Sequence, residues 1–122
     1  MGAALPELHL PLPGTEPEAF IIICSTIPEN RMLDVDLGIS AQSMLLKAVE
    51  MGLNGLVIGA FNKENIKNEF SLPYDPMLIV AVGKGAETIQ LIDIEEKDDH
   101  RYYRHDRVHY VPKVKVEQLI LK

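Results

Sequence analysis

Apolar runs, each short and nearly free of polar side chains, recur along the chain. They occupy residues 18–25, 56–58 and 77–83, and a weaker run occupies residues 88–94. A short run of branched apolar residues without polar alternation is typical of a strand that is buried on both faces. We therefore expect these segments to form the strands of a β-sheet core.

A longer apolar segment, from Val35 to Met51, lies between the first two runs. Asp34 and Asp36 carry the negative charge that favours a helix N-terminus, and Gly52 suits the left-handed residue that ends a helix. The segment is therefore predicted to be the longest helix. Because it is apolar around most of its circumference, a single small domain cannot readily cover it. We expect the protein to associate into an oligomer through this helix.

Shorter elements follow. Asn62 suits the N-cap of a second helix, which is predicted to run to about Phe70. β-prone residues on either side of Asp106-Arg107 predict a hairpin over residues 101–111. Residues 116–121 are expected to form a turn of helix or a strand. Together, the helices and strands place the chain in the α+β class.

A length of 122 residues suits one compact domain. Proline recurs through residues 1–17, which removes amide donors and predicts an extended arm. We expect the core of the domain to span residues 18–94. Residues 95–122 then form a tail that is able to wrap a partner subunit.

Composition narrows the range of functions. The chain is 47% hydrophobic and 25% charged, as in ordinary globular proteins, so the disordered classes are excluded. A net charge of -6 repels phosphate backbones, and we expect no nucleic-acid partner. No apolar run approaches the roughly 20 residues of a membrane span, and we expect no membrane partner. The single cysteine, Cys24, suits a reducing compartment, and the protein is predicted to be cytoplasmic.

The tail gathers imidazoles and carboxylates, which are common metal ligands. These are His100, His105, His109, Asp98, Asp99 and Asp106. The turn predicted at Asp106-Arg107 separates His105 from His109, so the spacing argues against a shared ion and no metal ligand is predicted. A metal-binding tail is the third and weakest of the functional hypotheses.

Several motifs carry a family resemblance in combination. The longest is residues 36–62, DLGISAQSMLLKAVEMGLNGLVIGAFN. It is joined by Leu72-Pro73, by Gly83-Lys84 at the end of the third apolar run, and by residues 102–104 and 108–113 of the tail. Taken together, they resemble the nitroreductase family of flavin enzymes.

The resemblance implies an α+β sandwich with a mainly antiparallel sheet, which forms a homodimer through the long central helix from Val35 to Met51. It also implies that FMN binds at the subunit interface and carries hydride from NAD(P)H to a nitro or quinone-type acceptor. No catalytic side chain is predicted, because the cofactor supplies the chemistry.

By this resemblance, the residues that contact FMN are Val57, Ile58, Gly59, Ala60, Lys84 and Arg104. A strand that stops at two small residues presents bare backbone to a planar ring. An ammonium group between two glycines can reach a phosphate. Arg104 is the weaker phosphate candidate, and its alternative role is an ion pair with a nearby aspartate of the tail. If FMN binds, we expect Gly59 to resist bulky replacement, whereas Gly85 is expected to tolerate alanine more readily unless its φ is positive.

Family members usually begin with further helices that bear an Arg-Ser-x-Arg type motif, which grips the FMN phosphate and ribityl chain. Residues 1–17 contain no arginine or lysine. We therefore expect a domain truncated at its N-terminus that binds FMN weakly or purifies without it. The alternative hypothesis is a flavin-free domain of this family with a structural or partner-binding role.

Overall fold

A computed structural model describes residues 14 and 16–120. The chain divides into two compact units, the first ending at Gly85 and the second beginning at Ala86. The predicted arm over residues 1–17 lies almost entirely outside the described residues. The prediction of one domain with a core over residues 18–94 stays a prediction.

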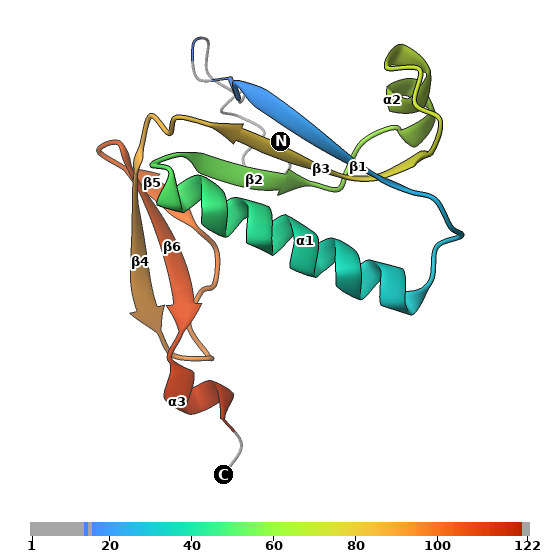
Figure 1. Ribbon diagram of the computed structural model, residues 1–122. Coiled ribbons are helices and arrows are strands. Elements are labelled where there is room, and N and C mark those ends of the chain that lie inside the picture. Colours follow the sequence, from blue (N-terminus) through green and yellow to red (C-terminus); the bar gives the residue numbers. More distant parts are fainter. Residues whose placement is uncertain (1–13, 15, 121–122) are drawn as a thin grey trace. The chain divides into compact units, whose positions relative to one another are not determined.

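The N-terminal unit is built on an antiparallel sheet in the order β1-β3-β2 (Figure 1). Its strands are β1 (Ala19–Ser25), β2 (Asn54–Ile58) and the central β3 (Asp75–Gly83). Helix α1 (Arg31–Glu50) contacts β2 and β3, and the short helix α2 (Lys63–Glu69) contacts β3. The strand predictions over these segments and the second helix are confirmed.

The core of this unit lies along the middle of β3, where Val80 and Ala81 are almost fully buried. Helix α1 adds Ala41 and Ala48 to the core. The helix comes close to β2 because Gly55 has no side chain: a Cβ there would lie 2.5 Å from Leu45 Cδ2. Small residues on both elements thus allow the helix to pack directly on the sheet.

The prediction that residues 18–25 are buried on both faces is wrong. β1 is an edge strand that pairs with β3, and Phe20 is 57% exposed. At the other edge of the sheet, Val57 of β2 is 44% exposed. A uniformly apolar run indicates a strand but carries no information about its place in the sheet. In a sheet of three strands, two must be edges.

Helix α1 begins earlier than the predicted Val35. Its N-cap is Asn30, whose side-chain oxygen accepts hydrogen bonds from the backbone N–H groups of Met32 and Leu33, at 3.0 and 3.1 Å. The helix ends as expected before Gly52, which has a φ of 75°. No helix among the described residues is long and apolar enough to cross a membrane.

The C-terminal unit contains a second three-stranded sheet, in the order β4-β6-β5. Strand β4 (Thr88–Ile94) runs parallel to β6 (Val108–Val114), which pairs antiparallel with β5 (Tyr103–His105). The short helix α3 (Val116–Leu119) follows, so the helical alternative for residues 116–121 holds over its described part. The predicted α+β class with mainly antiparallel sheets is confirmed.

The hairpin predicted over residues 101–111 is confirmed as β5 and β6. Its turn consists of Asp106 and Arg107, with φ values of 47° and 63°. Positive φ at both central residues matches the right-handed twist of the two strands. Across the hairpin, the rings of Tyr103 and Tyr110 stack at 4.9 Å.

The cap of α1 leads to a prediction. Asn30→Ala removes the acceptor of two backbone N–H groups and should destabilise the protein by about 1 kcal/mol, whereas Asn30→Asp should retain most of the stability. Urea unfolding of the three proteins measures the difference. Equal stability of Asn30→Ala and the parent would show that the cap contributes nothing.

Candidate functional site

The end of β2 is the first part of the candidate site. Ile58 makes the last pair of the ladder, with Ile79, and Gly59 and Ala60 then lead toward α2. A Cβ at Gly59 would meet nothing closer than Leu78 Cδ1 at 4.0 Å. Gly59 and Ala60 are exposed, and a flat ligand can approach their backbone closely.

Lys84 lies at the opposite end of the same sheet. It follows Gly83, which pairs with Asn54, whereas Ile58 pairs with Ile79. Five steps along β3 separate Ile79 from Lys84, or roughly 16 Å at about 3.3 Å per residue. The fold of one chain therefore does not bring Lys84 next to Gly59. The Lys84 side chain forms no ion pair with any residue in the described part of the chain.

The loop after Lys84 is held by β2. The backbone N–H of Gly85 donates to Asn54 Oδ1 at 3.1 Å. A Cβ on Gly85 would lie 2.3 Å from that same oxygen, so a larger residue must displace the amide that holds the loop. In the chain without FMN, a Cβ at Gly59 is accommodated more easily than a Cβ at Gly85, which would shift the Asn54 side chain. The tolerance expected with FMN bound stays a prediction.

Arg104 belongs to the C-terminal unit, on β5. Its Nε donates to both carboxylate oxygens of Glu87, at 2.8 and 3.1 Å, and its Nη2 lies 3.5 Å from His109 Nδ1. The alternative role of an ion pair is therefore correct in kind, but the partner is Glu87 and not an aspartate of the tail. Strand pairing brings Arg104 and His109 together, and sequence spacing alone does not show this.

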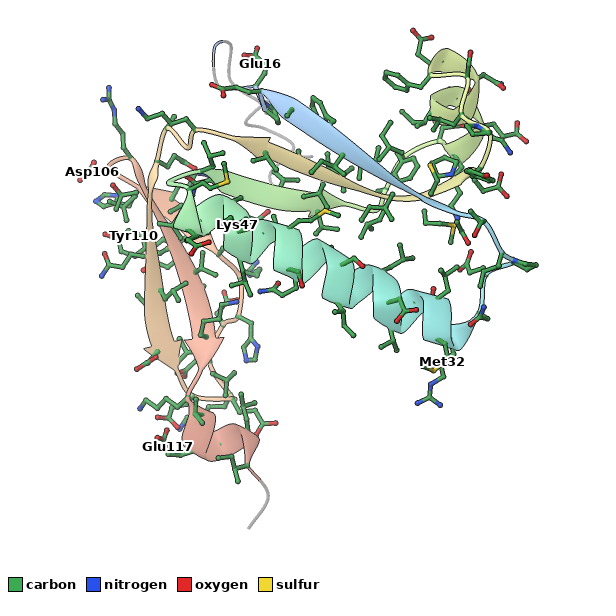
Figure 2. All side chains as sticks on the ribbon, in the orientation of Figure 1. Glu16, Met32, Lys47, Asp106, Tyr110 and Glu117 are labelled. Atoms are coloured by element: carbon green, nitrogen blue, oxygen red, sulfur yellow. The ribbon has the colours of Figure 1, made fainter. Side chains whose placement is uncertain are left out.

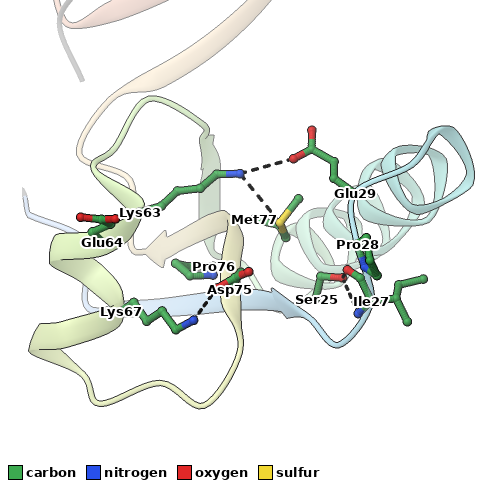
Figure 3. A pocket seen from close by; sticks show the side chains of 10 residues that line it. All are labelled: Ser25, Ile27, Pro28, Glu29, Lys63, Glu64, Lys67, Asp75, Pro76 and Met77. Atoms are coloured by element: carbon green, nitrogen blue, oxygen red, sulfur yellow. Dashed lines mark hydrogen bonds and ion pairs between the residues drawn. The ribbon is translucent and has the colours of Figure 1, made fainter.

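A hollow of about 240 Å³ lies beside α2 (Figure 3). The loop that follows β1 and the first residues of β3 also line it. Lys67 Nζ pairs with Asp75 at 2.5 Å, and Lys63 Nζ lies 3.6 Å from a carboxylate oxygen of Glu29. Hydrogen bonding and the charge of Lys67 lower the pKa of Asp75. Ser25 Oγ donates a hydrogen bond to the carbonyl oxygen of Ile27 and accepts one from its backbone N–H. Both ammonium groups therefore already have carboxylate partners.

This hollow is not predictable from the sequence. Its one local signal is the spacing of Lys63 and Lys67, which places the two amines on one face of a helix. Their carboxylate partners come from distant segments, and only the folded chain brings them there.

The histidines of the C-terminal unit lie in different surroundings. His105 Nε2 lies 3.2 Å from Asp106 Oδ2, and His100 Nε2 lies 2.8 Å from the carbonyl oxygen of Glu96. His109 is in the Arg104 cluster. Over the described residues, no three histidine, cysteine or acidic side chains are placed to share a metal ion.

Strand β2 ends at Ile58, and Gly59 and Ala60 then lead to the short helix α2, as the sequence predicted. The chain belongs to the nitroreductase family, because the profile of that family matches residues 9–84. The match ends one residue before the N-terminal unit does, and the tail motifs at residues 102–104 and 108–113 lie outside it. None of the curated proteins searched matches the chain.

The Asn54–Gly85 contact generates a prediction. Gly85→Ala should destabilise the protein by about 1 kcal/mol, because it displaces a hydrogen bond of that typical size. Gly59→Ala, the matched control, should stay within about 0.5 kcal/mol of the parent, as at other open surface positions. Chemical unfolding monitored by circular dichroism compares the two, and a smaller loss for Gly85→Ala would contradict the assignment.

Proposed function

We propose that the protein is an FMN-dependent oxidoreductase that transfers hydride from NAD(P)H to a nitro or quinone-type acceptor. Membership of the nitroreductase family implies an oxidoreductase of the flavin kind. The observation that ties the proposal to particular residues is the open backbone at Gly59, where a Cβ would meet only Leu78 Cδ1, at 4.0 Å.

The residues present at the end of β2 fit a flavin ring. Gly59 and Ala60 follow the last ladder pair, so their backbone is available to hydrogen-bond to the edge of a ring. Val57 is 44% exposed and supplies apolar surface beside them. FMN, when bound, supplies the hydride-transfer chemistry, and the chain's task is to orient the ring and exclude water from its face.

Lys84 is the proposed phosphate contact. It is exposed and lies in a loop that Asn54 fixes. Its separation from Gly59 along β3 favours a contact to FMN that is held by the other subunit of a dimer. Arg104 is the weaker candidate, because Glu87 already occupies its Nε donor.

A homodimer through α1 is the proposed assembly. Apolar residues recur along the helix on the side away from the sheet, and each is at least 47% exposed: Met32, Val35, Ile39, Leu46 and Val49. Figure 2 shows Met32 pointing away from the sheet. A second copy of the helix would cover this stripe, which water otherwise contacts.

The flavin-free alternative is favoured by two observations. Within one chain Lys84 is far from Gly59, so it reaches the same FMN only if a dimer forms, and Arg104 is already paired with Glu87. A phosphate that lacks two charge-assisted hydrogen bonds, at about 1.5–3 kcal/mol each, loses roughly two to four orders of magnitude in affinity. We therefore expect FMN to bind with a dissociation constant above about one micromolar.

Flavin titration tests the cofactor site. The parent chain should quench FMN fluorescence on binding, and Gly59→Leu should weaken the affinity at least tenfold, because its side chain fills the space over the backbone. Gly59→Ala is the control for the fold and should have a smaller effect. Equal affinities of Gly59→Leu and the parent would remove Gly59 from the site, and no binding by the parent would support the flavin-free alternative.

The phosphate contact is tested by comparing two ligands. Lys84→Ala should weaken binding of FMN more than binding of riboflavin, since only FMN carries the phosphate. Equal losses for both ligands would refute the role of Lys84.

The dimer leads to a separate prediction. Val49→Asp should convert the dimer to a monomer, because an unpaired charge buried in an apolar interface costs several kcal/mol. Lys47→Gln, an exposed polar change on the same turn, should leave the dimer intact. Leu45→Asp should unfold the chain instead, since Leu45 packs on Gly55. Light scattering that finds a monomeric parent at micromolar concentration would overturn the proposal.

A further inference from the structure

A polar cluster joins the three strands of the C-terminal unit. Glu87 immediately precedes β4, Arg104 lies on β5, and His109 lies opposite Arg104 on β6. Arg104 Nε donates to Glu87, and Arg104 Nη2 lies 3.5 Å from His109 Nδ1. The guanidinium group of Arg104 is therefore the link between the carboxylate and the imidazole.

The 3.5 Å contact between Arg104 Nη2 and His109 Nδ1 is compatible with a neutral imidazole. Because an arginine nitrogen only donates, a hydrogen bond at this contact has Nδ1 as its acceptor, and the ring proton is then on Nε2. Nε2 and Arg104 Nη1 are both buried, and neither has a hydrogen-bond partner among the described residues. The cluster is thus a partly satisfied network, which a small change in charge can disturb.

The groups that face His109 differ in their effect on its charge. Its side chain is 20% exposed, and burial lowers the pKa of His109 below the ordinary 6.5. The charge of Arg104 also lowers this pKa, whereas Glu87, 3.9 Å from Nδ1, raises it. The ring of Tyr102 packs edge-on at 5.1 Å, and β4 contributes the apolar Ile89 as the register partner.

We propose that Glu87, Arg104 and His109 form an acid-sensitive clasp that holds the β5–β6 hairpin to the start of β4 and opens when His109 takes up a proton. The added proton on Nδ1 makes two donors face each other where one now accepts. The imidazolium then competes with Arg104 for Glu87, and the guanidinium is left with an unpaired donor. The clasp lies outside the residues matched by the family profile.

The direction of the pH dependence follows from linkage. A histidine whose folded-state pKa is lowered binds the proton more readily in the open state. The clasp therefore contributes fully to the stability of the hairpin above pH about 6.5. This contribution is lost as the pH falls from there toward the folded-state pKa of His109.

Hydrogen exchange of the full chain tests the clasp. After correction for intrinsic rates, the backbone amides of β5 and β6 should lose protection several-fold between pH 7 and pH 5. His109→Gln has no titrating ring and should abolish this pH dependence. His105→Gln, in the adjacent turn, is the matched control and should retain it. A parent whose hairpin protection does not change with pH, or a His109→Gln variant that keeps the change, would overturn the proposal.

A second measurement needs no His109 variant. In an NMR titration, His109 should have a midpoint below the ordinary value of 6.5. Arg104→Gln should raise the midpoint by removing a like charge, and Glu87→Gln should lower it by removing the opposite charge. A His109 midpoint at or above 6.5 in the parent would show that the cluster does not disfavour the proton.

Discussion

Burial of the middle of β3 is the constraint on which the N-terminal unit depends. Both other strands pair with β3, and both helices contact it. Val80 and Ala81, at its centre, are exposed by 0% and 1%. Burying a side chain the size of valine contributes on the order of 1.5–3 kcal/mol. A chain of this size has few such positions, so each segment that covers β3 matters to the whole unit.

Only one of the two apolar sides of helix α1 packs on the sheet. Ala41 and Ala48 let the helix pack closely on the sheet, while Ile39 and Leu46 remain on the outer side, each 61% exposed. A helix that served only its own sheet would have polar residues there. The same segment therefore connects the folding of the unit to its proposed association, because a second copy of α1 would cover the outer stripe.

Local patterns predicted most elements but not their partners. The spacing of apolar residues located the strands, and Asn62 marked the start of α2, because these signals are carried by neighbouring residues. The edge position of β1 and the Glu87–Arg104 pair depend on strand register, which joins residues far apart in the chain. The candidate site shows the same division: the open backbone at Gly59 was predictable, whereas the distance to Lys84 follows from the antiparallel pairing of β2 with β3.

The two units on either side of Gly85 are stabilised by different interactions. The N-terminal unit relies on apolar burial around β3, and the family match ends with it, at Lys84. In the C-terminal unit, Glu87, which immediately precedes β4, forms a half-buried ion pair with Arg104 of β5. Apolar burial does not depend on pH near neutrality, but a network that includes His109 does. Acid should therefore act on the C-terminal unit before it disturbs the sheet that carries Gly59.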